Sequence, residues 1–229
     1  MKEGDVLVIS SKFLAISEGR VVELESVNPT SEAVGLASAY RMDEKLCELI
    51  IRESDDIVGG IPGFLLASKD GILTPNAVID KSNIQHGRAV LYPRKPAESA
   101  RMIREGVKFS KGASVGVVVC DSRLAPTRRG TTGVAVAASG VEAILDLRGK
   151  KDLFDNVLKV SAEAFADDLA SAAEILMGES DEAVPIVVVT GIGARLDSRS
   201  EYSAGDFAIP LADCFYMRSL GRSRSDSDN

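Results

Sequence analysis

Short runs of apolar residues, rich in β-branched side chains, alternate with polar segments along the chain. Three of these runs, residues 6–9, 115–120 and 185–189, have the length of a strand and are followed at once by small or charged residues. An uninterrupted apolar run of this kind is typical of a strand that is buried on both faces of a sheet. We therefore predict three buried strands, with Asp121 at the point where the second one leaves the core.

Apolar residues at helical spacing predict four helices. Residues 28–32 combine a proline with hydroxyl groups that can cap a helix, and the pattern beyond them fits two helices separated near residues 41–43. Residues 98–107 and 167–177 predict two more helices, the second with Gly178 as its C-cap. The residues of this last helix that we expect to face inwards are Leu169, Ala172, Ala173 and Leu176.

Turn residues and alternating patterns occupy the remaining segments. Residues 59–63 predict a turn, residues 64–67 a short strand and residues 69–71 a hairpin turn. Residues 157–164 alternate between apolar and polar positions, which favours a strand. The polar end of the chain, residues 221–229, has the composition of a disordered segment.

The order of these elements predicts a single α+β domain. No internal segment has the composition of a linker, and no repeat is visible along the sequence. We therefore assign residues 1–218 to one domain, a mixed sheet with interleaved helices, and residues 219–229 to a disordered tail.

Composition narrows the classes of function. The chain has 229 residues, 45% of them hydrophobic and 27% charged, as in ordinary soluble proteins. Its net charge of −7 argues against nucleic-acid binding. No apolar run approaches the roughly 20 residues needed to span a membrane, and the first residues lack a signal-peptide pattern. We expect a cytoplasmic protein that binds neither nucleic acid nor membranes.

Cysteine and histidine restrict the kind of metal site. Cys47, Cys120 and Cys214 are too few and too widely spaced for a disulfide framework or a thiolate metal site. His86 is the only histidine, and we assign it no role. Any bound metal should therefore be a hard ion with oxygen ligands.

The strongest candidate chemistry follows the second predicted strand. Asp121 and Ser122 stand directly after it, and Arg123, Arg128 and Arg129 follow before a Gly- and Thr-rich return. A carboxylate and a hydroxyl beside guanidinium groups suit a metal ion and an anion such as phosphate or a carboxylate. An ordinary solvated loop between two strands is the alternative.

Two further polar clusters have similar features. Asp80 and Asn83 are three residues apart after an apolar pair, so one turn could direct both at a ligand. The alternative is a turn in which these side chains satisfy their own backbone. Ser11 and Lys12 follow the first predicted strand and could hold phosphate oxygens, although the glycine spacing of a P-loop or dinucleotide fingerprint is absent.

Five stretches, taken in order, resemble the coenzyme F420-0:γ-glutamyl ligase family. They are GDVLVISSKFLAISEGRVV, TPNAVIDKSNI, VGVVVCDSRLAPTRRGTTGVAVAASGV, ILDLRGKKDLF and FADDLASAAEILMGESDEAVPIVVVTG. The resemblance extends from Gly4 to Gly191. No single stretch is diagnostic, but their common order is specific.

The resemblance implies a dimeric α+β fold and an amide ligase that depends on GTP and on Mg²⁺ or Mn²⁺. In the family, GTP phosphorylates a carboxylate of the deazaflavin precursor, and the amino group of L-glutamate then displaces the phosphate. The matching positions here are Asp80, Asp121 and Ser122 as metal ligands, Ser11, Lys12 and Asn83 as nucleotide contacts, and Arg128 and Arg129 as phosphate or substrate contacts.

Several positions depart from the family pattern and leave alternatives open. Ile16 replaces a lysine, Leu124 and Ala125 replace a Gly-Arg pair, and Val78 replaces a glycine. The family also carries a nucleotide-binding segment before its first strand, whereas this sequence starts at Met1. One alternative is a paralogue that binds a metal and an anionic ligand, or a partner, without ligase activity. Another is a ligase for a different carboxylate or with a different nucleotide.

Overall fold

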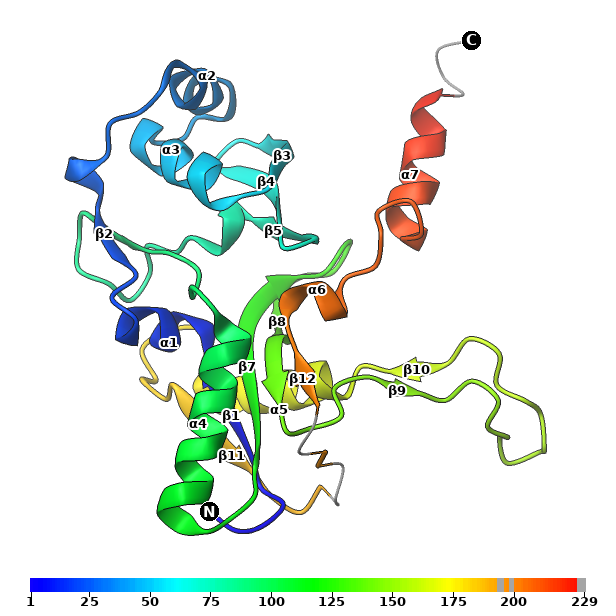
Figure 1. The fold of residues 1–229 in the computed structure, drawn as a ribbon. Helices are drawn as coiled ribbons and strands as arrows, with labels where there is room; N and C mark the ends of the chain where they lie inside the picture. Colours follow the sequence, from blue (N-terminus) through cyan, green and yellow to red (C-terminus); the bar gives the residue numbers. More distant parts are fainter. Residues whose placement is uncertain (193–195, 198–199, 226–229) are drawn as a thin grey trace.

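The main body of the protein is a five-stranded sheet with a long helix on each face (Figure 1). The computed structural model describes residues 1–192, 196–197 and 200–225. The strand order is β11-β1-β7-β8-β12; β1 and β7 are parallel, and the other neighbours are antiparallel. The strands are β1 (Val6–Ser10), β7 (Gly116–Leu124), β8 (Thr131–Ser139), β11 (Ile186–Val189) and β12 (Glu201–Tyr202). The α+β class expected from the sequence is confirmed.

Two helices bury the two faces of this sheet. The α5 helix (Phe165–Met177) packs on one face and α4 (Pro96–Lys111) on the other. Successive side chains of a strand point to opposite faces, so Val118 of β7 lies in the core beneath α5, whereas Val119 lies in the core beneath α4. The continuous apolar run of β7 is therefore explained by burial on both sides.

A second lobe, made by the chain between α1 and α4, has its own core (Figure 1). Two helices pack there against a small antiparallel sheet in which β4 lies between β3 and β5. Its elements are α2 (Ser31–Tyr40), α3 (Glu44–Glu53), β3 (Asp56–Ile61), β4 (Phe64–Lys69) and β5 (Ile72–Pro75). Ile50 and Leu65 are among its fully buried side chains.

Short elements connect and extend these two parts. They are α1 (Ser11–Ser17), β2 (Val21–Glu23), η1 (Leu24–Ser26), η2 (Asn76–Val78), β6 (Arg88–Val90), β9 (Leu145–Asp146), β10 (Ala162–Glu163), α6 (Ala204–Phe207) and α7 (Phe215–Ser225). The β2 strand pairs with β6, and β9 pairs with β10 at the base of an arm that projects from the body (Figure 1). None of the helices in the described part of the chain is long and apolar enough to cross a bilayer.

The predicted break between α2 and α3 is confirmed and has a local cause. The hydroxyl of Thr30 accepts a hydrogen bond from the Ala33 amide at 3.3 Å and caps the start of α2. Arg41 adopts a left-handed conformation with φ of 53°, which ends α2. The Asp43 carboxylate then accepts from the Leu46 amide at 2.8 Å and caps α3.

Some sequence-based predictions in the second lobe and the arm are wrong. The glycine pair in residues 59–63 belongs to β3 and pairs with β4, so only residues 62–63 form the turn. The strand predicted over residues 157–164 is reduced to the two residues of β10, because this segment lies in the exposed arm with no core to pack against.

Two predictions also fail in part, one in a helix and one at the sheet edge. In α5, Ala172 and Leu176 are exposed, whereas Leu169 and Ala173 are buried as predicted, together with Ala166 and Ala170. The β11 strand is an edge strand, so alternate residues are exposed instead of both faces being buried. The α7 helix extends to Ser225, and residues 226–229 lie outside the described part. The boundary at residue 218 and the disordered tail beyond it stay predictions.

Candidate functional site

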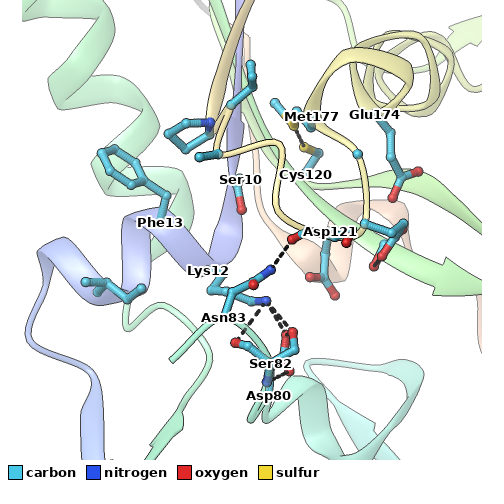
Figure 2. Close-up of a pocket in the computed structure, with 18 residues that line it drawn as sticks. Ser10, Lys12, Phe13, Asp80, Ser82, Asn83, Cys120, Asp121, Glu174 and Met177 are labelled. Atoms are coloured by element: carbon cyan, nitrogen blue, oxygen red, sulfur yellow. Dashed lines mark hydrogen bonds and ion pairs between the residues drawn. The ribbon is translucent and has the colours of Figure 1, made fainter. Parts of the chain in front are cut away.

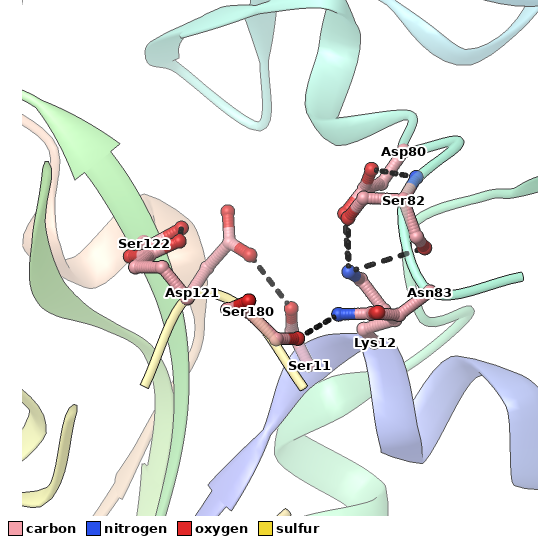
Figure 3. A network of polar contacts seen from close by, with 9 residues as sticks. Ser11, Lys12, Asp80, Ser82, Asn83, Asp121, Ser122 and Ser180 are labelled. Carbon is pink, nitrogen blue, oxygen red and sulfur yellow. Dashed lines mark hydrogen bonds and ion pairs between the residues drawn. The ribbon is translucent and has the colours of Figure 1, made fainter. Parts of the chain in front are cut away.

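The site forms where the parallel strands β1 and β7 end side by side. Ser10 is in register with Cys120, so the next residues, Ser11 and Asp121, are neighbours although they are far apart in the sequence. The Ser11 hydroxyl donates a hydrogen bond to the Asp121 carboxylate at 2.9 Å (Figure 3). The carboxyl ends of parallel strands meet at one edge of a sheet. This explains how the polar residues that follow two separate apolar runs come together.

Asp80 reaches the same edge from the second lobe. Its backbone exchanges two hydrogen bonds with Val90, which fixes its position beside β6. Its carboxylate accepts hydrogen bonds from the Ser82 amide at 2.6 Å and the Ser82 hydroxyl at 3.0 Å. The sequence left open whether this carboxylate satisfies its own backbone or faces a ligand. The structure shows the local turn, which orients Asp80 towards Asp121 (Figure 3), and the contact with a ligand stays a prediction.

Lys12 and Asn83 link the elements around this edge. The Lys12 ammonium lies 2.5 Å from the Asp80 carboxylate and donates to the Ser82 hydroxyl at 2.8 Å. The Asn83 side-chain amide donates to the carbonyl of Ser180, in the loop that follows α5, at 2.6 Å (Figure 3). Both side chains therefore present polar groups beside Asp80.

These residues border a cleft of about 350 Å³, which we call the donor cleft (Figure 2). Its walls come from α1, from the loop after η2, from β7 and from the end of α5. The predicted site residues that line it are Lys12, Asp80, Asn83, Asp121 and Ser122. Ser11 stands behind Asp121 and lines a smaller adjoining pocket.

Arg128 and Arg129 lie apart from this cluster. Both are exposed in the turn that joins β7 to β8, and neither lines the donor cleft. Their predicted contact with phosphate or substrate stays a prediction.

Sequence reasoning missed two carboxylates, Glu174 and Glu179, that line the same cleft. Glu179 accepts hydrogen bonds from the Ser122 hydroxyl at 3.4 Å and from the Thr131 hydroxyl at 2.7 Å. Burial, together with a hydrogen bond and charge repulsion from Glu179, raises the pKa of Glu174 to about 8. The available signal was their position on either side of Gly178, which ends the helix at the rim of the cleft.

The two aspartates are in different electrostatic states. Burial raises the pKa of Asp121 above its ordinary range, and the Ser11 hydrogen bond and the charge of Arg123 only partly oppose this effect. Burial acts on Asp80 in the same direction, but its hydrogen bonds with Lys12 and Ser82 outweigh it and lower the pKa of Asp80. The Lys12 ammonium therefore balances the charge of Asp80 through an ion pair, whereas no cationic side chain among the described residues forms an ion pair with Asp121.

The oxygen ligands that line the cleft fit a hard divalent cation. The lining residues include four carboxylates, Asp80, Asp121, Glu174 and Glu179, but Lys12 is the sole cationic side chain among the described residues that line it. Within the described residues, no three His, Cys, Asp or Glu side chains are grouped closely enough to hold a metal alone. Mg²⁺ is commonly bound by one or two carboxylates together with substrate phosphates and water, so such an ion fits this set.

Positions that depart from the family pattern lie at or near this site. Ile16 lines the donor cleft, and Val78 and Leu124 line a second hollow beside it. Val78 has a φ of 63°, a left-handed conformation that a β-branched residue rarely adopts, which explains physically why a glycine suits this position.

Comparison with known proteins agrees with the resemblance inferred from the motifs. The family model described as F420-0:Gamma-glutamyl ligase matches residues 1–191, a range that contains every predicted site residue. A coenzyme F420:L-glutamate ligase of Methanocaldococcus jannaschii is 38% identical over 192 residues, covering 83% of this chain and 77% of the relative. The proteins of the same name from Methanopyrus kandleri and Archaeoglobus fulgidus are 37% and 36% identical, covering 86% and 87% of this chain and 79% and 80% of those relatives.

Proposed function

This chain belongs to the F420-0:gamma-glutamyl ligase family, and we propose that it joins L-glutamate to a carboxylate of the deazaflavin coenzyme F420 precursor. In this proposal GTP is the phosphoryl donor and Mg²⁺ or Mn²⁺ is the metal. The observation that carries it is the convergence of Lys12, Asn83, Asp80, Asp121 and Ser122 on one cleft, although they come from separate segments of the chain.

The reaction needs two steps, because a carboxylate resists attack by an amine. In the first, a carboxylate oxygen of the acceptor attacks the γ-phosphorus of GTP, GDP leaves, and an acyl phosphate forms. In the second, the deprotonated amine of L-glutamate attacks the acyl carbon, the carbon–oxygen bond to phosphate breaks, and an amide and inorganic phosphate result. Both substrates are anionic, so the site must supply positive charge and hydrogen-bond donors.

The residues of the donor cleft suit these requirements. Lys12 would exchange its ion pair with Asp80 for a phosphate oxygen of the nucleotide, and the Asn83 amide would donate to the same group. Asp80, Asp121 and Ser122, with Glu179 beside Ser122, would hold the metal. A bound divalent ion supplies neutralisation of the phosphate charge as the phosphoryl group moves. We also propose that Arg128 and Arg129, which lie outside the cleft in the turn between β7 and β8, contact anionic groups of the bound substrate.

The test is GDP release by the purified protein with GTP, L-glutamate, Mn²⁺ and the unglutamylated deazaflavin coenzyme, followed by mass spectrometry. We expect GDP release that requires both substrates and a product heavier by one or two glutamyl units. Reactions that lack the acceptor or L-glutamate are the controls. GDP release without any glutamylated product would overturn the proposal.

A ligase for another carboxylate or nucleotide is the second candidate. Ile16 favours it, because an apolar side chain lines the donor cleft at the position where the family has a lysine. If the first assay gives no product while Mn²⁺ binds to the wild type and not to an Asp80→Asn/Asp121→Asn double variant, a screen of other carboxylates and nucleotides decides between this candidate and a paralogue without ligase activity.

A further inference from the structure

A second hollow of about 460 Å³, which we call the acceptor hollow, lies beside the donor cleft. The two spaces share Asp80, Ser82, Asp121 and Ser122, so this polar group forms a boundary between them. The donor cleft extends from the boundary towards α1 and the end of α5. The acceptor hollow extends instead between the second lobe and the hairpin of β7 and β8.

Both spaces combine polar and apolar walls. The donor cleft has ammonium, amide and hydroxyl donors from Lys12, Asn83 and Ser10, beside the apolar side chains of Phe13 and Ile16. In the acceptor hollow, Phe64 of β4 and Leu124 of β7 form an apolar wall and are 51% and 58% exposed. Large apolar side chains left exposed in a hollow are typical of a surface that binds an apolar part of a ligand.

Charge in the acceptor hollow gathers at its boundary with the donor cleft. Asp80 and Asp121 bring carboxylates there, and Lys81, which follows Asp80 directly, is the sole cationic side chain among the described residues that line the hollow. The ends of the hollow therefore differ: the boundary is charged and polar, and the wall formed by Phe64 and Leu124 is apolar. A molecule with an apolar or aromatic body and a carboxylate that meets the metal proposed at this boundary fits this arrangement.

The geometry of phosphoryl transfer decides which substrate such a hollow takes. The attacking oxygen and the leaving oxygen lie roughly in line on opposite sides of the phosphorus. With the nucleotide in the donor cleft, the acceptor carboxylate has to approach across the boundary from the opposite side. The acceptor hollow is a second space that opens on the same four boundary residues, which makes it the candidate for this approach.

We propose that the acceptor hollow binds the carboxylate substrate, with its carboxylate at the metal that Asp80, Asp121 and Ser122 would hold and its apolar body against Phe64 and Leu124. Lys81 then contacts an anionic group of this substrate. This inference rests on the proposed function and assigns Phe64 and Leu124 as the residues that determine acceptor specificity.

The first test separates acceptor binding from nucleotide binding by steady-state kinetics. We expect Phe64→Ala and Leu124→Ser each to raise the KM for the deazaflavin acceptor about tenfold and to leave the KM for GTP within about twofold. Phe109→Ala is the matched control, because Phe109 is 95% exposed on α4 and lines neither space. Thermal melting of each variant identifies a loss that comes from unfolding.

The second test reports binding without turnover. The chain contains no tryptophan, so Phe64→Trp introduces a single fluorophore into the hollow, and Phe109→Trp provides the same fluorophore elsewhere. We expect the deazaflavin acceptor to change the emission of Phe64→Trp saturably and more strongly than that of Phe109→Trp.

The outcomes separate the two proposals. Turnover with an unchanged acceptor KM in Phe64→Ala and no saturable emission change in Phe64→Trp overturns the acceptor hollow and leaves the ligase function standing. A saturable change in Phe64→Trp, together with a wild type that forms no glutamylated product with GTP, supports the hollow as an acceptor site and overturns the GTP-dependent ligase reaction. Absence of both binding and turnover overturns both.

Discussion

At the scale of single residues, Asp121 has the most demanding environment in the cleft. It shares a face of β7 with Arg123 and is held by the Ser11 hydroxyl, while burial raises its pKa. Burial therefore disfavours the charged form of this carboxyl group, and a bound cation would favour it.

We expect Asp121→Asn to lower turnover at least a hundredfold, because it removes the charge and keeps the oxygen that accepts from Ser11. The melting temperature at pH 8 should stay the same or rise, since the variant loses a buried charge. Asp167→Asn is the matched control: burial also raises the pKa of Asp167, but this carboxylate accepts from the Ala135 amide and does not line the cleft. Wild-type turnover in Asp121→Asn contradicts the metal assignment.

Glu174 predicts a pH dependence of stability. Its pKa is raised from an ordinary 4.5 to about 8, so the folded protein holds a proton that the unfolded chain releases in this range. The free energy of unfolding should therefore fall as the pH rises from about 4.5 to about 8. Thermal melting without metal measures this slope, which Glu174→Gln should reduce and the exposed Glu142→Gln should not. An equal slope in Glu174→Gln and the wild type would contradict the assignment.

At the scale of elements, the contact between α5 and β8 positions the missed carboxylates. A Cβ atom on Gly133 of β8 would lie 2.5 Å from the backbone oxygen of Ala170, so the helix backbone comes very close to the sheet. Alanines on the inner face of α5 permit this approach. The end of α5 then places Glu174 at the rim of the donor cleft.

We expect Gly133→Ala to destabilise the fold by about 1–3 kcal/mol, because the added methyl group must push the helix backbone away. Gly106→Ala is the control of opposite sign: nothing lies within 4 Å of its added Cβ in the exposed middle of α4, so it should stabilise by about 0.5–1 kcal/mol. Urea denaturation measures both. If Gly133→Ala and Gly106→Ala changed the free energy of unfolding equally, the close packing of α5 against Gly133 would be contradicted.

The elements that the sequence predicted correctly have strong local signals. The apolar run before Asp121 and the capped start of α2 need no tertiary information. The inner face of α5 could not be predicted, because Leu176 has a stronger apolar signal than the alanines, and the choice depends on how closely the helix approaches β8.

For a similar reason, the sequence identified only part of the candidate site. Asp80 and Asp121 follow apolar segments and were found by position, and the structure brings both to one cleft. For Glu174 and Glu179 the sequence offers only their position beside Gly178, at the end of α5. Glu179 accepts hydrogen bonds from Ser122 and Thr131, which are more than forty positions away, so no local pattern predicts its place in the cleft.

At the scale of the whole molecule, the arm between β9 and β10 is exposed along most of its length. It projects from the body, and its Leu153 and Phe154 are 97% and 84% exposed (Figure 1). Apolar side chains so fully exposed on a projecting segment favour burial against a second chain. This supports the homodimer that the family resemblance implies, which we propose for this protein.

Sedimentation analysis tests the homodimer. We expect the wild type to sediment as a dimer and a Leu153→Asp/Phe154→Asp double variant to shift towards monomer, because charged groups oppose burial of the arm. The double variant Glu142→Asp/Glu163→Asp, outside this apolar tip, should keep the wild-type mass. A monomeric wild type contradicts the proposal.

The contacts that close the donor cleft also set a time order for its appearance during protein synthesis. The hydrogen bond between Ser11 and Asp121 spans 110 positions, and that between Asn83 and Ser180 spans 97. A chain emerging from the ribosome therefore has Lys12 and Asp80 long before it has the loop at Ser180. A half-made protein therefore cannot assemble the cleft, because the wall that Ser180 provides is still missing.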